Sequence, residues 1–447
     1  MLSGKTGYIS PPTMKKVAFI TIGCKLNQFE TMAMREALEK VGFQTVPFAP
    51  GAHIYIVNTC TVTGRSDYKG RQMVRRALRM KPPEGLVVVT GCQSQLRGEE
   101  FLALGADLVL GNLEKAHIHQ VIQEALERGT KGLVVQPVDQ CREFQPMPLH
   151  SFPGYSRAFL KVQDGCNNRC TYCTVWKARG PARSAPPSWI LEEAEELVTS
   201  GYRELVLTGV HLGAYRWQDW DLARLLEDLL EIKGLEKIRL SSIEPQEFTP
   251  GLKALIASRE KIAPHLHIPV QSGDDRILRL MGRQYTRRDL TALIEELVGS
   301  RPGLGIGVDV MVGFPGEDEE AFENTYRLLK DLPIYYMHIF TYSPRPGTPA
   351  AEMKDQVHPQ VKGERYERLR ELRAKKIRTF RESHLGKPIK VLIEGRRDRA
   401  TGLTRGLSEN YIPFLFLEEP PEGRGRYVTA LGEKLLGDMV AGRRVNP

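Results

Sequence analysis

Short apolar runs alternate with amphipathic stretches along the first part of the chain. The runs VAFIT, IYIVNT and LVVVT have the length and the β-branched composition of buried strands. Residues 28–41 and 67–79 carry apolar side chains at helical spacing. Strands that alternate with helices favour a parallel sheet covered by helices. We therefore predict an α/β domain at residues 14–128, after a flexible leader at residues 1–13.

A second alternation of strands and helices begins after residues 129–152, which contain prolines, show no clear period and are predicted to form a linker. Six strand–helix units predict an α/β domain at residues 153–384 that is built as a partial (β/α)6 barrel. By analogy with complete barrels, its reactive groups should lie on the loops that follow the strands. The strand candidates read AFLKVQ, ELVLTG, KIRLSS, HLHIPV, GIGVDVMVG and YMHIFTY.

Residues 385–447 differ from the rest, because short β-like runs are separated by glycine turns. This pattern predicts a small β-barrel, which either binds nucleic acid or only caps the preceding domain. The net charge of +9 favours a polyanionic partner. Two cationic stretches, residues 71–81 and 365–381, are either RNA-binding surfaces or solvated helix faces, since glutamates interleave the second.

The seven cysteines bear on the cellular compartment. No apolar run approaches the roughly 20 residues that span a membrane, and the N-terminal residues lack the apolar region of a signal peptide. An odd number of cysteines in such a chain favours a reducing, cytoplasmic compartment and metal ligation over disulfides. Cys141 lies in the predicted linker and receives no role.

Three of these cysteines, Cys166, Cys170 and Cys173, form the motif C-x3-C-x2-C. Three thiolates on one loop can hold three irons of a [4Fe-4S] cluster and leave the fourth iron open for a substrate or a second cofactor. A zinc site is the alternative, but zinc motifs favour paired C-x2-C units or a nearby histidine. Because no histidine lies between Tyr155 and Thr208, the spacing predicts a reactive iron–sulfur cluster.

Three further cysteines, Cys24, Cys60 and Cys92, each follow a predicted strand of the first domain. The carboxyl ends of parallel strands share one edge of a sheet, where ligands bind. We therefore predict that these cysteines converge on a second cluster site. The alternative is that each is a small buried apolar side chain.

Taken together, these motifs resemble those of the radical S-adenosylmethionine (SAM) methylthiotransferase family, and they occur in the family's order. GCKLNQFE, NTCTVTG and TGCQSQ resemble its N-terminal domain. RLSSIEP, HIPVQSG, GVDVMVGFPGE and YSPRPGTPAAEM resemble its central domain, and GLTRGLSENYI resembles its terminal TRAM barrel. The resemblance implies SAM and two [4Fe-4S] clusters as cofactors. The cluster on the C-x3-C-x2-C loop would cleave SAM to a 5′-deoxyadenosyl radical, and the other cluster would carry the sulfur that is transferred.

The resemblance also suggests SAM contacts on three loops that follow strands of the barrel. The loop after the second strand would hold the methionine end, the loop after the fourth would meet the ribose, and the loop after the fifth would line the adenine. Ordinary glycine turns are the alternative. The candidate residues are Gly209, Gly213, Gln271, Ser272, Gly273, Gly313 and Glu317.

Two local details complete the predicted sites. Gln28 and Asn58 lie beside cysteines of the first domain and either donate hydrogen bonds to sulfur or cap local backbone. After Cys173, relatives commonly carry two aliphatic residues, a proline and an aromatic residue, whereas this chain has Thr174–Lys177, including Trp176. The path of the chain beside the cluster is therefore not predicted by the resemblance.

The motifs GCKLNQ, ARGPARS, TGVHLGAY and GLSENYI resemble the threonylcarbamoyladenosine branch of the family most. This implies the anticodon stem-loop of tRNA as substrate and 2-methylthio-N6-threonylcarbamoyladenosine as product. Two other substrates remain open, namely N6-isopentenyladenosine in tRNA and an aspartate of a ribosomal protein. A different class of function also remains open, that of a non-catalytic iron–sulfur protein that binds RNA. We expect a monomer without a membrane partner, which depends on an electron donor and a sulfur source that the sequence does not identify.

Overall fold

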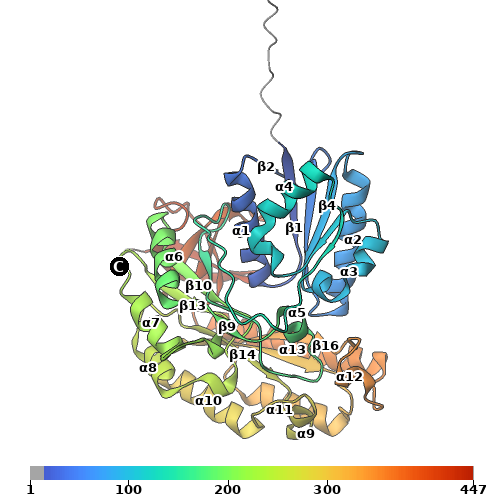
Figure 1. Ribbon diagram of the computed structural model, residues 1–447. Helices are drawn as coiled ribbons and strands as arrows, with labels where there is room; N and C mark the ends of the chain where they lie inside the picture. Colours follow the sequence, from blue (N-terminus) through green and yellow to red (C-terminus); the bar gives the residue numbers. More distant parts are fainter. Residues whose placement is uncertain (1–14, 446–447) are drawn as a thin grey trace, which may run out of the picture. The chain divides into compact units, whose positions relative to one another are not determined.

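The computed structural model describes residues 15–445, so the predicted leader at residues 1–13 lies outside the described part. The chain divides into two compact units between Val138 and Asp139 (Figure 1). Among the described helices, none is both long and apolar enough to cross a membrane. The two units are described in turn.

The first unit contains a six-stranded parallel sheet with the order β2-β1-β3-β4-β5-β6. The three predicted strands are confirmed as β1 (Lys16–Thr21), β3 (Ile54–Thr59) and β4 (Leu86–Gly91). Every residue of β3 and β4 is buried, as expected for central strands that are covered on both faces. The order changes direction between β1 and β3, where parallel sheets of this kind bind ligands.

Three short strands and four helices complete this unit. β6 lies within the predicted linker and pairs in parallel with β5, so the sheet continues past residue 128. The helices are α1 (Lys25–Lys40), α2 (Gly64–Met80), α3 (Cys92–Ala103) and α4 (Ile118–Arg128), and the short strands are β2 (Gln44–Val46), β5 (Leu108–Leu110) and β6 (Gly132–Val134).

The second unit begins with the predicted partial barrel, and all six predicted strands are confirmed. They form two parallel three-stranded sheets, β13-β10-β7 and β14-β15-β16. The two sheets meet where the N–H of Ile243 donates to the carbonyl oxygen of His267 at 3.1 Å. The strands are β7 (Ala158–Lys161), β10 (Glu204–Thr208), β13 (Lys237–Leu240), β14 (His265–Gln271), β15 (Gly305–Val312) and β16 (Tyr336–Thr341).

Helices follow each barrel strand and cover the outer face of the curved sheet (Figure 1). In β15, Val308, Val310 and Val312 are fully buried, whereas Asp309 and Met311 on the other face are only partly buried. This alternation places apolar side chains toward the helices and leaves a more polar inner face. The helices are α6 (Pro187–Thr199), α7 (Leu222–Leu230), α8 (Pro250–Ser258), α10 (Arg287–Ser300), α11 (Glu319–Asp331) and α13 (Pro359–Glu382).

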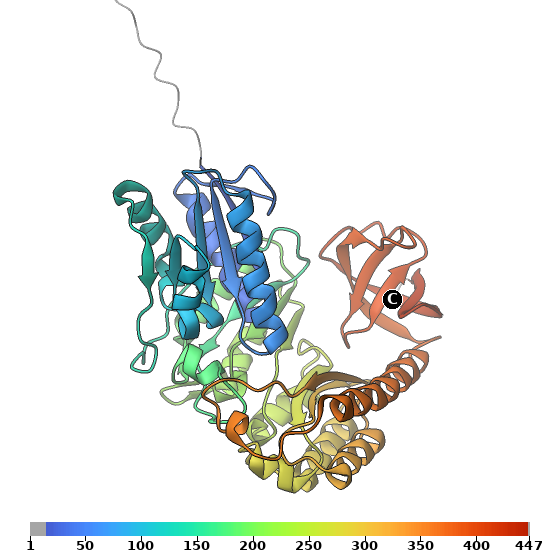
Figure 2. The same ribbon diagram turned by 90° about the vertical axis from the view of Figure 1, so that its right-hand side faces the viewer.

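The end of the chain forms the predicted small β-barrel, which follows the long helix α13 (Figure 2). Its strand order β17-β18-β19-β21-β20 closes on itself, so no sheet edge is left open. Val391, Phe414 and Phe416 lie in its buried core. The strands are β17 (Pro388–Arg397), β18 (Thr404–Ser408), β19 (Pro413–Phe416), β20 (Tyr427–Leu436) and β21 (Met439–Arg444).

The turn between β18 and β19 docks against the amino ends of the barrel strands. Arg239 of β13 pairs with Glu204 of β10 at 2.6 Å and donates to the carbonyl oxygen of Glu409 at 3.0 Å. The ring of Tyr411 stacks on that of His265, with 4.5 Å between centroids. The turn therefore closes this end of the partial barrel, which we call its floor.

Breaking the Arg239–Glu204 pair from one side is expected to destabilise the docked barrel strongly. Both side chains are fully buried, so Arg239→Met leaves the Glu204 carboxylate buried without its ion-pair partner and should cost about 3–5 kcal/mol. The double variant Glu204→Gln/Arg239→Met removes both charges and should regain most of that loss. Thermal unfolding and limited proteolysis near residue 385 measure the effect, and equal stability of the two variants would contradict it.

The same pair makes stability sensitive to acid. Although burial opposes ionisation, Arg239 and Arg157 lower the pKa of Glu204 from 4.5 to about 2. When folding lowers the pKa of a carboxyl group, the group adds its full contribution to folding stability at pH values above its pKa in the unfolded chain. This contribution should therefore be complete above about pH 4.5 and lost as the pH falls toward 2, and the double variant should lack that part of the pH dependence.

Candidate functional site

The structure brings Cys24, Cys60 and Cys92 together, as the strand positions predict. Cys60 follows β3 directly, Cys92 is the first residue of α3 after β4, and Cys24 precedes α1. Burial and then the charges of Cys92 and Cys24 raise the pKa of Cys60 to about 12. The thiols therefore lie close enough to repel one another as thiolates, at the point where the strand order changes direction.

Local backbone geometry allows this close approach. Gly23 has a φ of +111°, and a Cβ placed on it would lie 2.7 Å from Sγ of Cys60. Any side chain at Gly23 would therefore displace the thiol. The N–H of Val62 points at Sγ of Cys60 (3.5 Å), and Nδ2 of Asn112 lies 3.9 Å from Sγ of Cys92. Such donors orient and stabilise thiolate ligands.

The sequence does not single out Asn112, which follows the fifth strand of the sheet and lies 20 residues after Cys92. Asn58, which the sequence does single out, donates instead to the carbonyl oxygen of Asn27 and to Oγ1 of Thr31, both at 3.0 Å. These contacts are structural, but they join β3 to α1 across 31 and 27 residues and do not cap local backbone.

In the second unit, the loop that carries Cys166, Cys170 and Cys173 follows β7 and the two-residue strand β8 (Gln163–Asp164). Cys170 is buried, and the other two thiols are partly buried. Burial and then the charge of Cys170 raise the pKa of Cys173 to about 12. This loop is therefore a second place where three thiols gather, at the carboxyl end of a parallel strand.

A buried carboxylate fixes the start of this loop. Asp164 lies 2.8 Å from Nζ of Lys161, 3.4 Å from Nη1 of Arg179 and 3.2 Å from Nη2 of Arg183. Although burial opposes ionisation, the three cations hold the pKa of Asp164 well below its usual range. Gly165 has a φ of +73°, and a Cβ there would lie 1.9 Å from the carbonyl oxygen of Pro181. The network thus fixes the backbone immediately before Cys166.

The unusual residues after Cys173 form the short helix α5 (Val175–Arg179). The guanidinium of Arg169 lies 4.2 Å from the centre of the Trp176 ring, and the ammonium of Lys177 lies 5.2 Å from it. Lys177 also donates to the carbonyl oxygen of Gly347 at 2.5 Å. Cation–π contacts therefore hold this stretch beside the cysteines.

Residues that follow three other barrel strands also contact the cysteine loop and fix its position. Arg283, which lies beyond β14, binds Glu244, beyond β13, at 2.6 Å and donates to the hydroxyl of Tyr172 at 2.5 Å. The N–H of Ala350, beyond β16, donates to the carbonyl oxygen of Thr171 at 3.0 Å. The cysteine loop therefore lies at the carboxyl ends of the barrel strands, where sequence reasoning expects reactive groups.

His211 is a neighbour of the cysteine loop that sequence reasoning missed. Its Nδ1 lies 3.6 Å from Sγ of Cys166, and its Nε2 lies 2.5 Å from Oε1 of Glu247. Although burial opposes the charge, the bonds to Cys166 and Glu247 raise the pKa of His211 to about 10. The sequence did carry one signal for this residue. His211 lies just after the second predicted barrel strand, where reactive groups are expected.

Comparison with known proteins decides the family. The radical SAM superfamily matches residues 160–329, and a family described as uncharacterized protein family UPF0004 matches residues 16–111. The chain is 42% identical over 399 residues to the threonylcarbamoyladenosine tRNA methylthiotransferase MtaB of Aquifex aeolicus, covering 89% of this chain and 95% of that protein. The chain belongs to the radical SAM methylthiotransferase family.

Two further proteins extend this comparison. A tRNA-2-methylthio-N(6)-dimethylallyladenosine synthase of Wolbachia pipientis is 33% identical and covers 92% of this chain and 94% of its own length. The radical SAM methyltransferase TsrM of Kitasatospora setae, solved with cobalamin and a [4Fe-4S] cluster bound, has a TM-score of 0.57 at 16% identity, covering 76% of this chain and 77% of its own. The TsrM likeness shows the fold alone.

Radical SAM methylthiotransferases are transferases that use SAM and two [4Fe-4S] clusters. The residues present fit two such clusters. Thiolates are the ligands that iron–sulfur clusters take, and each unit gathers three of them. A bound cation would offset the burial, and the smaller repulsion between thiolates, that raise the pKa values of Cys60 and Cys173.

Of the seven predicted SAM contacts of this methylthiotransferase, Gln271 is the last residue of β14 and the others lie after the expected barrel strands. A Cβ on Gly209 would lie 2.9 Å from Oε1 of Gln163, and one on Gly213 would lie 2.1 Å from Oε2 of Glu247. Gln271 has a left-handed φ of +61° at an irregularity in β14. The two glycines therefore bring the loop after β10 against side chains that adjoin the cysteine loop.

The other candidates contact the covering helices. Ser272 and Gly273 bind Oγ1 of Thr325 in α11 at 3.2 and 2.9 Å. Glu317 accepts from the N–H of Gly313 and from Arg365 of α13, both at 2.8 Å. These contacts fix the loops to the outer helices, and the contribution of all seven residues to SAM binding stays a prediction.

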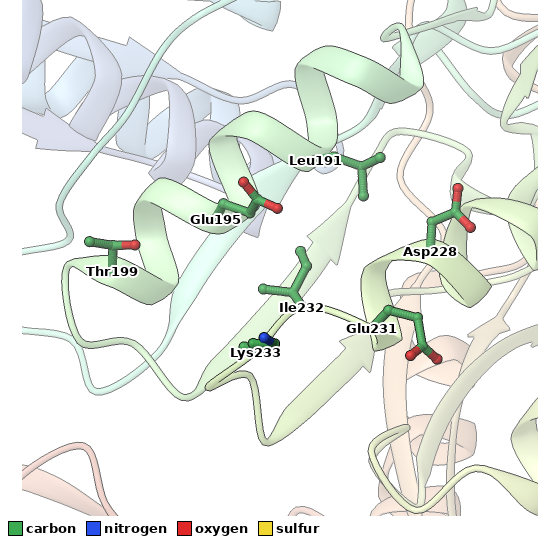
Figure 3. A pocket seen from close by; sticks show the side chains of 7 residues that line it. All are labelled: Leu191, Glu195, Thr199, Asp228, Glu231, Ile232 and Lys233. Atoms are coloured by element: carbon green, nitrogen blue, oxygen red, sulfur yellow. The ribbon is translucent and has the colours of Figure 1, made fainter.

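A surface hollow of the enzyme lies away from both cysteine sites. It measures about 560 Å³ and lies between α6 and α7, at the end where these helices lead back to β10 and β13 (Figure 3). Its charged lining is mostly acidic, with Glu195, Asp228 and Glu231 beside Lys233. Such a surface repels the phosphates of RNA, so the hollow is no candidate for the reaction site.

Proposed function

We propose that this enzyme adds a methylthio group to C2 of N6-threonylcarbamoyladenosine beside the tRNA anticodon, giving 2-methylthio-N6-threonylcarbamoyladenosine. The observation that carries the proposal is the pair of three-cysteine sites, each at the carboxyl ends of parallel strands. The names of the relatives from Aquifex aeolicus and Bacillus subtilis, 42% and 37% identical, support the threonylcarbamoyl substrate.

The proposed division of labour follows from the chemistry of C2. This carbon carries an aromatic hydrogen that neither a general base nor a simple nucleophile activates. When bound, SAM and the cluster of the barrel supply a carbon radical that can abstract that hydrogen, and the other cluster supplies sulfur. Cys166, Cys170 and Cys173 would hold the first cluster, and Cys24, Cys60 and Cys92 the second.

The surrounding side chains would hold these ligands in place. The Asp164 network fixes the backbone before Cys166, and Arg283 ties the far end of the cysteine loop to the loops after β13 and β14. His211 would donate to the sulfur of Cys166 while Glu247 orients its ring. These residues position the ligands.

RNA contact is assigned to α2 in preference to α13. On α13, Arg365 is buried against Glu317, and Arg368 pairs with Glu319 and Glu323 of α11, so carboxylates already engage these two cations. On α2, Arg75, Arg76 and Arg79 are exposed. Such cations bind RNA phosphates in a salt-dependent way, and a base in a single-stranded loop leaves its stack at low cost.

The proposal includes a cytoplasmic monomer that depends on an external electron donor and a sulfur source. N6-isopentenyladenosine is the alternative tRNA substrate, supported by the Wolbachia pipientis relative. An aspartate of a ribosomal protein is a third alternative, which the net charge of +9 favours less than RNA.

A competition experiment tests the substrate. Reconstituted enzyme is offered matched tRNAs with threonylcarbamoyl or isopentenyl at N6, together with the ribosomal protein, and products are measured by mass analysis. Methylthiolation of the threonylcarbamoyl tRNA alone supports the proposal. Preferential modification of either other substrate would overturn it and leave the two cysteine sites standing.

A further inference from the structure

Three polar side chains on neighbouring strands form a cluster on the inner face of the barrel. Nε2 of His267 on β14 lies 2.9 Å from Oδ1 of Asp309 on β15. Nδ1 of His338 on β16 lies 3.2 Å from the same oxygen. The two imidazole rings are 5.0 Å apart between centroids. Asp309 is in register with His338, whereas His267 lies one strand repeat before the residue that pairs with Asp309, so the two distances to Oδ1 of Asp309 join the three side chains into one layer across the sheet.

The backbone makes room for this layer. Asp309 pairs in register with His338, and Gly307 pairs with His267. A Cβ on Gly307 would lie 3.0 Å from Nδ1 of His267, so a side chain there would crowd the ring. Although burial opposes ionisation, the two histidines hold the pKa of Asp309 well below its usual range. Asp309 is therefore an anion that orients both rings.

The layer lies between the floor of the barrel and the level of the cysteine loop. Below it, Tyr411 of the terminal barrel stacks on His265, which precedes His267 by two residues on the same strand face. Above it, Met311 lies two residues beyond Asp309, about 7 Å along the strand. Met311 and Tyr172 of the cysteine loop pack against the same buried cluster. The strand that carries Asp309 therefore continues to the buried cluster against which the cysteine loop also packs.

Aromatic side chains flank the exposed member of the cluster. Tyr336, His338 and Phe340 alternate along β16 and share its inner face. The His338 side chain is 49% exposed and lies edge-on to Tyr336, with 4.8 Å between ring centroids. Aromatic faces stack unpaired bases, so this row suits an extruded purine. An oriented imidazole in the middle of the row adds a polar group at one level.

We propose that His338, oriented by Asp309 and assisted by His267, binds the carboxylate of the threonylcarbamoyl group and so selects this substrate over the isopentenyl one. The inference rests on the proposed function. His338 has one ring nitrogen on Asp309, and its other ring nitrogen would donate to a ligand carboxylate in a charge-assisted bond. An isopentenyl group has no polar atom, so it would leave the layer unpaired.

The geometry favours this use over a metal site, although the two histidines and the carboxylate could also hold a metal ion. One nitrogen of each ring lies at hydrogen-bond distance from a single carboxylate oxygen, so these nitrogens are aimed at Asp309. The carboxylate of the substrate also lies several bonds from C2. Recognition and reaction can therefore occur at different levels of the barrel strands.

The test compares binding of anticodon stem-loops by reconstituted holoenzyme. The stem-loops carry threonylcarbamoyladenosine, its neutral carboxamide analogue, isopentenyladenosine or unmodified adenosine. We expect the wild-type enzyme to bind the carboxylate form at least about tenfold more tightly than the carboxamide. His338→Phe should erase this ratio without weakening carboxamide binding, and His338→Arg should retain a preference for the carboxylate.

His150 provides the matched control, because it is also partly exposed and also pairs with a carboxylate, that of Glu196 on the outer helix α6, at 2.7 Å. His150→Phe should leave the ratio unchanged. An undiminished ratio in His338→Phe would overturn the inference, as would a wild-type ratio near one on tRNA that the enzyme modifies; the proposed function would survive both. The metal content of the holoenzyme gives a further outcome. If the wild-type enzyme holds zinc or iron in excess of the two cysteine sites, and His338→Phe loses that excess, the inference is overturned in favour of a metal site.

Discussion

Replacing Cys166, Cys170 and Cys173 together with alanine is expected to abolish 5′-deoxyadenosine formation from SAM. The three thiols are the soft ligands at the carboxyl ends of the barrel strands, and without them no iron is left to bind and reduce SAM there. The enzyme is reconstituted anaerobically with iron and sulfide, reduced, and mixed with SAM. Chromatography then measures 5′-deoxyadenosine, and iron and zinc are determined on the same sample.

The matched control is Cys141→Ala, which removes a thiol that is partly exposed and donates to the carbonyl oxygen of Glu143 at 3.4 Å. This variant should keep its iron and its 5′-deoxyadenosine formation. If the triple variant formed as much 5′-deoxyadenosine as the wild-type enzyme, this loop could not be the site of the radical cluster. Wild-type protein that holds zinc in place of iron and leaves SAM intact would support a non-catalytic RNA-binding protein.

The second large effect concerns Cys24, Cys60 and Cys92. Their triple alanine variant should lose about half of the iron of a fully loaded enzyme, because one of two four-iron clusters is removed. It should still form 5′-deoxyadenosine, since the other three cysteines lie on a separate unit. It should form no methylthio product, because the proposed source of sulfur at C2 is lost.

Separate measurements of iron, 5′-deoxyadenosine and modified nucleoside make this prediction specific. A variant that simply misfolds would lose all three, and circular dichroism of the first unit would show it. Asn112→Ala provides a milder comparison, because it removes a donor near Cys92 and leaves all the thiols in place. Full iron content with normal sulfur transfer in the triple variant would contradict a second cluster at this sheet edge.

The longer strands could be predicted because burial leaves a direct trace in the sequence. β3, β4 and β10 are buried throughout and appear as continuous apolar runs. The three-residue strands β2 and β6 carry no such signal, since pairing with a neighbour defines them more than their own residues do. Only the folded sheet shows that the predicted linker contributes β6.

Some residues of the candidate site could likewise be predicted from the sequence, and others could not. Cysteines could be identified because few other roles explain their spacing and their places after strands. His211, Arg283 and Asn112 could not, because each meets its partner through the fold. Cys166 and His211 are 45 residues apart, and Tyr172 and Arg283 are 111 apart. Asp164 gives no sequence signal either, since its three cationic partners become a network only when the loop closes.

The docking of the terminal barrel has a consequence for chimeric proteins. Glu409 and Tyr411 fit against Arg239, Glu204 and His265, so the terminal barrel completes the fold of the domain before it. A chimera that takes its terminal domain from a relative should therefore import the matching residues at the amino ends of β10, β13 and β14. Exchanging both halves of this contact together would keep the domains joined and allow tRNA preferences to be compared between relatives.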